Sequence, residues 1–87
     1  MKHIRTSSGF EIELPEERID DYELFEELVK IETRNEMSGL PMVVERILKD
    51  DRERLFDHVR REDGTVPASL VIREIFEIIK GTDGKKS

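Results

Sequence analysis

Alternation of apolar and charged residues marks the start of the chain. Phe10, Ile12 and Leu14 alternate with glutamates, which is the period-two pattern of a strand with one buried face. A second extended segment precedes this strand across a short loop that contains Gly9. A loop of this kind joins neighbouring antiparallel strands. We therefore predict a β-hairpin over residues 2–14.

Later segments show helical spacing. Apolar residues recur at i, i+3 and i+4 in four stretches, the repeat that places them on one face of a helix. Asp20 or Asp21 is positioned to cap the first of these helices. The predicted helices cover about 20–33, 40–49, 51–61 and 67–80. In the first, the predicted buried stripe is Tyr22, Phe25, Leu28, Val29 and Glu32, widened by Leu24 and Ile31.

Helix ends are marked by proline, acidic and glycine residues. Pro41 and Pro67 suit the first turns of two helices, because proline lacks only an N–H that would be unpaired there. Asp50 followed by Glu53 resembles a capping box. Gly81 is placed to end the last helix.

These elements predict one α+β domain over residues 1–81. The domain is mainly helical, with the N-terminal β-hairpin packed on a bundle of about four helices, because two strands alone are marginal in water. Residues 82–87 have nothing to bury and are expected to form a flexible tail.

Composition narrows the class of protein. The chain has 87 residues, of which 36% are hydrophobic and 41% charged. Its apolar runs are shorter than the roughly 20 residues that span a bilayer, and no basic-then-apolar leader opens it. We therefore expect a soluble, cytoplasmic protein with no membrane partner.

The inventory of catalytic and ligating side chains is small. Cysteine is absent and there are two histidines, so thiolate chemistry and zinc-finger sites are excluded. Residues 61–66 resemble the centre of an EF-hand loop, but Val59, Arg61 and Leu70 stand where calcium needs oxygen ligands. His58 has Thr65 and Ser69 near it in sequence, yet no spacing fixes a nucleophile and base together. We expect no catalytic, metal or cofactor-binding site.

Charge is concentrated near the N-terminus. Residues 10–32 hold ten acidic and two basic side chains, a local net charge of −8 against −6 for the whole chain. A phosphate backbone repels such a surface, so nucleic acid is not an expected partner. The charge suits either a solvated face or docking to a basic protein.

The last predicted helix is apolar around most of its circumference. This leaves two interpretations: the helix is central to the bundle, or part of it contacts a partner. The candidate partner-binding residues are Leu70, Val71, Ile75, Phe76 and Ile79.

A family resemblance covers nearly the whole chain. It rests on Thr-Ser-Ser-Gly-Phe-Glu at the hairpin, the acidic Asp-Asp-Tyr-Glu-Leu-Phe-Glu, Leu-Pro-Met-Val-Val-Glu-Arg-Ile-Leu, the segment Leu55–Pro67 and the terminal Gly-Lys-Lys-Ser. Leu55–Pro67 is the most specific of these. With this layout the chain resembles the small tail assembly chaperones of long-tailed bacteriophages and prophages of Gram-positive bacteria.

The resemblance implies a non-enzymatic function. Such proteins bind the long, helical tape measure protein and keep it soluble while the tail tube assembles. They act in the cytoplasm of the bacterial host and are not expected in the mature virion. A longer form made by ribosomal frameshifting is common in the family, and Lys85-Lys86 is compatible with an A-rich slippery run.

Two other functions fit the same residues. An acidic adaptor, or nucleic-acid mimic, would bind a basic partner through residues 11–32, with strong salt dependence. A structural tail or head-completion component would remain in purified particles. The hairpin edges and apolar helices also allow a homo-oligomer.

Overall fold

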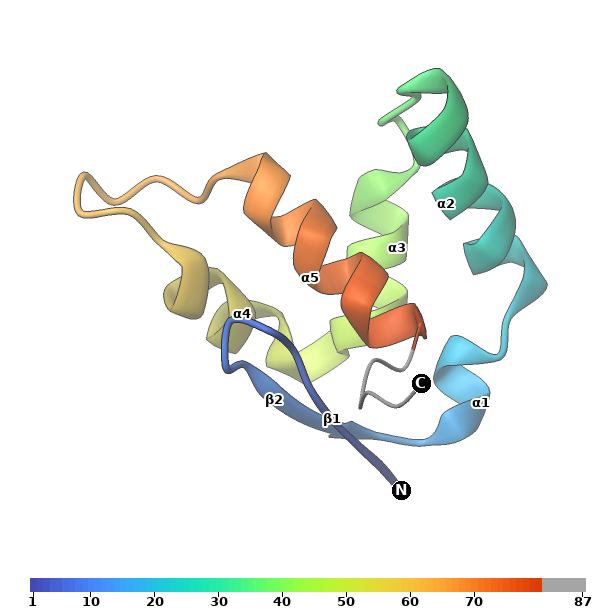
Figure 1. The fold of residues 1–87 in the computed structure, drawn as a ribbon, viewed down its shortest axis with the longest axis horizontal. Coiled ribbons are helices and arrows are strands. Elements are labelled where there is room, and N and C mark those ends of the chain that lie inside the picture. The colour runs from blue at the N-terminus through green and yellow to red at the C-terminus, as the bar shows by residue number, and fades with distance from the viewer. Residues whose placement is uncertain (81–87) are drawn as a thin grey trace.

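A computed structural model describes residues 1–80 of the chain. It confirms an α+β fold that is mainly helical, with an N-terminal hairpin against the helices (Figure 1). The predicted helix end at Gly81 and the predicted tail 82–87 lie outside the described residues. The elements are β1 (Lys2–Arg5), β2 (Glu11–Leu14), α1 (Glu16–Ile19), α2 (Tyr22–Arg34), α3 (Leu40–Leu48), the 3₁₀ turn η1 (Lys49–Asp51), α4 (Arg52–Val59) and α5 (Ala68–Lys80).

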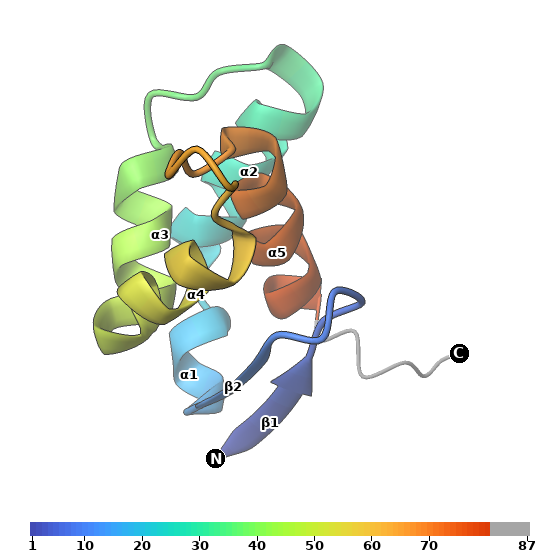
Figure 2. The same cartoon turned by 90° about the vertical axis from the view of Figure 1, so that its left-hand side faces the viewer.

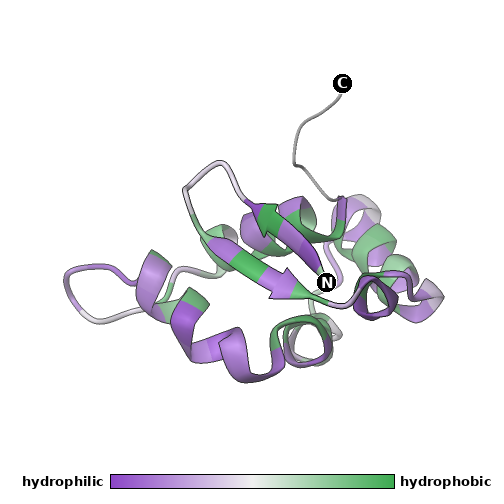
Figure 3. Cartoon of the chain, turned by 90° about the horizontal axis from the view of Figure 1, so that it is seen from below, coloured by the Kyte–Doolittle hydropathy of each residue, from purple (hydrophilic) through white to green (hydrophobic). Residues whose placement is uncertain are grey.

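The hairpin is antiparallel, with Ile4 paired to Ile12. In β2 the glutamates alternate with Ile12 and Leu14, whereas in β1 Ile4 is the one buried residue among polar neighbours (Figure 3). Gly9 has a φ of 93° in the connecting loop, a left-handed conformation that glycine adopts without steric cost. The predicted hairpin over residues 2–14 is therefore confirmed.

The core lies between the hairpin and the helices. The strands run beneath the helical layer (Figure 2), so their apolar face closes the bundle from one side. Ile4, Ile12 and Leu14 are almost completely buried there. The helical side of the same core is made by Leu24, Leu28, Ile31, Val43, Val44, Ile47, Leu48, Leu55, Val59, Val71, Ile75 and Ile78.

The short helix α1 was not predicted. Pro15 has a φ of −69° at its N-cap, and Glu16 and Glu17 occupy the first turn. Both features favour a helix N-terminus, because proline fixes φ and acidic groups interact well with the helix dipole. One turn is too short to show an apolar repeat, so the pattern gave no signal for it.

The predicted buried stripe of the first long helix is wrong in position. In α2 the buried residues are Leu24, Leu28 and Ile31, whereas Tyr22 and Phe25 are exposed. Two apolar stripes overlap on this helix, and each satisfies helical spacing. The core selects the one that includes the two residues expected only to widen the face.

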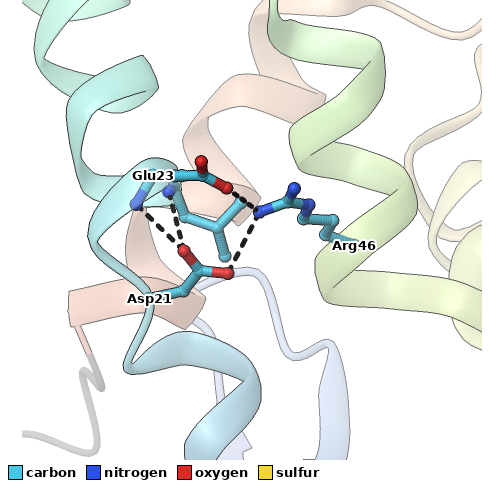
Figure 4. A network of polar contacts seen from close by, with 4 residues as sticks. Asp21, Glu23 and Arg46 are labelled. Atoms are coloured by element: carbon cyan, nitrogen blue, oxygen red, sulfur yellow. Dashed lines mark hydrogen bonds and ion pairs between the residues drawn. The ribbon is translucent and has the colours of Figure 1, made fainter.

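The N-terminus of α2 is fixed by Asp21. Its carboxylate accepts hydrogen bonds from the backbone N–H groups of Glu23 and Leu24 at 2.9 and 3.4 Å. Its other oxygen lies 3.2 Å from the Arg46 guanidinium, which also contacts Glu23 at 3.0 Å (Figure 4). The hydrogen bond to Glu23 and the nearby Asp21 charge raise the pKa of Arg46 above its usual value. Asp21 thus caps α2 and links it to α3.

Replacing Asp21 with alanine is expected to lower the free energy of unfolding by about 0.5–2 kcal/mol, the usual effect of losing an N-cap. Chemical denaturation followed by circular dichroism measures this. Asp20→Ala is the matched control, because Asp20 is exposed and contributes its backbone N–H to Glu16, which alanine retains. Equal losses in the two variants would contradict the cap.

The predicted capping box at Asp50 and Glu53 is also wrong. Asp51 is the N-cap of α4, and no side chain caps the helix there. The turn η1 runs directly into α4, and the Arg52 N–H bonds to the Lys49 carbonyl. The Lys49 carbonyl therefore accepts the bond from the start of α4 that a capping side chain would otherwise take.

Candidate functional site

An apolar groove lies between α3, α4 and the start of α5. Its volume is about 390 Å³, within the range of roughly 300–1,000 Å³ that is typical of binding pockets. Two of its lining residues, Glu45 and Arg52, are charged, and both are exposed. The remaining lining residues are Leu40, Pro41, Val44, Phe56, Val66, Ala68 and Val71.

The turn before α5 shapes one end of the groove. Gly64 has a φ of 91°, and the Arg61 N–H donates to the Thr65 carbonyl at 2.8 Å. This tight turn directs the chain back so that Val66 lines the groove. The small side chain of Ala68 in the first turn of α5 leaves space that a larger residue would fill.

One aromatic residue forms part of the wall. Phe56 is half-buried, and the Arg52 guanidinium lies 4.7 Å from its ring centroid. A cation over an aromatic face is attracted by the ring quadrupole. Arg52 also contacts Glu53 at 2.9 Å, so the positive charge that lines the groove next to Phe56 is paired.

The predicted partner-binding residues are dispersed. Val71 lines the groove, but Val71 and Ile75 are also buried in the core. Leu70, Phe76 and Ile79 are half-buried and pack against that core. The structure therefore brings one of the five into the groove, and the five do not form one surface.

Most groove residues were missed by sequence reasoning. Leu40, Val44 and Phe56 give no separate signal in the sequence, because each fits an apolar helical repeat that also serves the core. The one available local signal was Ala68, a small residue at the start of an otherwise bulky apolar helix.

The loop that resembles an EF-hand uses its carboxylate internally. Asp63 accepts hydrogen bonds from the Thr65 hydroxyl at 2.6 Å and the Thr65 N–H at 3.0 Å. These bonds, the hydroxyl first, hold the pKa of Asp63 below its usual value. Within residues 1–80 no group of three or more histidine or carboxylate side chains could hold a metal ion.

Ser8, His58 and Glu74 form a polar cluster where the hairpin loop meets α4 and α5. The Ser8 hydroxyl donates to the Glu74 carboxylate at 2.6 Å, and the His58 Nε2 atom lies 3.0 Å from the same oxygen of Ser8. In a catalytic relay the histidine stands between serine and carboxylate. Here the serine stands between the other two, so the contacts hold the loop in place.

None of the helices within residues 1–80 has the length and apolar character needed to cross a bilayer. A comparison of the chain with protein-family models, with curated proteins and with solved structures found no match.

Proposed function

We propose that the protein is a phage or prophage tail assembly chaperone that binds the tape measure protein. The proposal rests on the sequence resemblance, and one structural observation supports it: a groove with a mainly apolar lining on a small, highly charged domain. A chaperone for an apolar helical client needs a surface of this kind. The function is non-enzymatic and belongs to the cytoplasm of the host.

The mode of binding is a helix in a groove. An amphipathic client helix would place apolar anchors at i, i+3 or i+4 along the groove. A volume of about 390 Å³ accommodates one or two leucine- or phenylalanine-sized side chains. Each such side chain contributes about 1.5–3 kcal/mol when it is fully buried, so these anchors would supply part of the binding free energy.

The acidic part of the chain supports the same role. Glu16, Glu17 and Asp20 are exposed on and beside α1, and no base within residues 1–80 forms an ion pair with them. These charges leave the client groove clear, since none of the three lines it. Uncompensated charge favours a dissolved complex, because like-charged particles repel one another.

The test uses one charge at two neighbouring positions. Ala68 lines the groove and Ser69 does not, and both are exposed in the first turn of α5. A glutamate at either position interacts similarly with the helix dipole, but only Ala68→Glu places a carboxylate among the client's apolar anchors. Binding is expected to weaken at least about tenfold, which is roughly 1.4 kcal/mol, and Ser69→Glu should leave it unchanged.

The measurement is co-expression with the tape measure protein of the same phage or prophage. We expect the client to be soluble with the natural chain and with Ser69→Glu, and to aggregate with Ala68→Glu. A client that stays insoluble with the natural chain contradicts the proposed function. A client that Ala68→Glu still keeps soluble contradicts the groove as its binding site.

A second candidate function is supported by a different feature. Glu16, Glu17, Ile19 and Asp20 line a shallow hollow of about 420 Å³, which suits a basic side chain of a partner protein. This is the acidic adaptor. The affinity of its complex would fall steeply as salt increases from about 0.05 to 0.5 M, because added salt screens the attraction between exposed charges. The affinity of a client bound in the apolar groove would change little.

A further inference from the structure

Helix α2 carries an apolar stripe that faces away from the core. The stripe consists of Tyr22, Phe25 and Val29, which are 69%, 56% and 38% exposed. The spacing i, i+3, i+7 places them on one face, next to the face that carries the buried Leu24, Leu28 and Ile31. The rings of Tyr22 and Phe25 pack against each other with centroids 6.0 Å apart.

Within residues 1–80 the stripe is only partly covered. Helix α2 stands at the edge of the molecule, and its outer side faces away from α3 and α5 (Figure 1). Of the five large hydrophobic residues that are exposed in the described chain, three belong to this stripe. Clustering of this kind on a small domain is typical of an interaction surface.

Charged residues form a second row beside the stripe. Glu23 and Glu26 lie in the N-terminal half of α2, and Lys30 and Arg34 lie in the C-terminal half. Spacings of three, four and four place these residues in line along one flank. The flank is therefore acidic at one end and basic at the other.

This charge pattern is complementary to itself. Two copies of α2 that meet antiparallel about a twofold axis keep the same flank on the same side of the interface. Glu26 then lies opposite Lys30 of the second copy, and Glu23 lies opposite Arg34. In nearly the same register Phe25 of one copy packs on Val29 of the other. A parallel pairing would instead place the charged flanks of the two copies on opposite sides of the interface, where they could not pair.

We propose that this stripe is an isologous interface, through which α2 binds α2 of a second copy of the chain in antiparallel orientation. A twofold interface requires a patch that matches itself, and the combined apolar and charged rows meet that requirement. The interface shares no residue with the groove between α3, α4 and α5, so this inference does not depend on the proposed function.

Existing ion pairs do not prevent this association. Lys30 lies 3.4 Å from Glu27, Arg34 lies 3.8 Å from Glu36, and Glu23 contacts Arg46 at 3.0 Å. These pairs are partly or largely exposed, and pairs of this kind contribute little to stability. They can exchange for contacts between chains at small cost.

The interface is expected to be weak. A helix of 13 residues is about 20 Å long, and the area it can bury is at the low end for specific complexes. We expect a dissociation constant on the order of 100 μM, typical of a transient contact. Sedimentation equilibrium from about 10 μM to 1 mM should show the apparent mass rise from 10.2 kDa towards twice that value.

The first variant tests the apolar stripe. Phe25→Ser should weaken self-association at least tenfold and leave the circular dichroism spectrum unchanged, because Phe25 is exposed. Met37→Ser is the matched control, since Met37 is 40% exposed and lies outside α2. A natural chain that stays monomeric up to 1 mM overturns the proposal, and so does a Phe25→Ser variant that dimerises as tightly as the natural chain.

The second experiment tests antiparallel pairing by exchanging charges. Glu26→Lys and Lys30→Glu should each weaken association when studied alone, because each places like charges opposite one another. A 1:1 mixture of the two variants restores opposite charges at both contacts, so association should recover. The effect of each substitution on the stability of its own chain is the same in the single solutions and in the mixture, so a recovery of association reports on the contact between chains. A mixture that fails to recover overturns the antiparallel register.

Discussion

Truncating Ile75 to alanine is expected to lower the free energy of unfolding by about 2–5 kcal/mol. Ile75 is fully buried in α5, and a deletion of this size costs the transfer energy of the lost methyl and methylene groups together with the cavity they leave. The domain has 87 residues, so its total stability should be about 4–13 kcal/mol. The variant therefore loses a large share of its stability.

Thermal unfolding followed by circular dichroism measures this loss. In a domain of this size about 1 kcal/mol corresponds to a shift of 4–8 °C, so the midpoint should fall by about 8 °C or more. Ile79→Ala is the matched control, because Ile79 lies one turn further along α5 and is half-buried. Its midpoint should fall clearly less.

The same pair of variants separates the two interpretations of the last helix. Ile75 is a predicted partner-binding residue, and its burial favours the core interpretation for this position. If Ile75→Ala remained as stable as the natural chain but lost client binding, Ile75 would be a contact residue. That result would contradict its place in the core.

Local patterns predicted the hairpin and the main helices correctly. Alternation in the strand that ends at Leu14 has a single interpretation, since a shift by one residue would bury its glutamates. Helical periodicity located α2, α3, α4 and α5 to within a few residues. It did not fix which face of α2 is buried, because two stripes with the same period overlap there.

The groove and the polar cluster depend on tertiary contacts. Val44 and Val71 line one groove although they are far apart in the sequence. Ser8 and Glu74 are joined by a hydrogen bond across 66 positions. Neither contact leaves a local signal, since it arises only when the hairpin and the helices pack together. Thr65 and Ser69 are near His58 in sequence, but the serine that contacts His58 in the fold is Ser8.

Replacing Ser8 with alanine is expected to lower the free energy of unfolding by about 1.5–3 kcal/mol, the usual range for a hydrogen bond to a charged group. Glu74 is 2% exposed, and its Oε2 atom accepts the Ser8 hydroxyl at 2.6 Å. Its Oε1 atom is buried without a hydrogen-bond partner within residues 1–80. Within residues 1–80 the Ser8 hydroxyl is the one side-chain group that donates a hydrogen bond to this carboxylate. Its removal therefore leaves the buried Glu74 carboxylate without a side-chain donor.

Ser7→Ala is the matched control for this loss. The neighbouring Ser7 contacts Glu77 through both its hydroxyl and its backbone N–H, at 2.7 and 2.6 Å. Alanine at this position keeps the backbone bond, and the site is exposed. The expected cost is therefore below about 1 kcal/mol.

A double-mutant cycle shows whether Ser8 and Glu74 act as one unit. Glu74→Met replaces the buried carboxylate with an apolar side chain of similar size. When both partners of a hydrogen bond are replaced by apolar groups, the stability of the protein can change very little. The double variant should therefore be more stable than the sum of the single effects predicts, by about 1–2 kcal/mol. Strict additivity in denaturant titrations would contradict the contact. A measured coupling would mean that the hairpin loop is held to α5 by this buried carboxylate in addition to apolar packing.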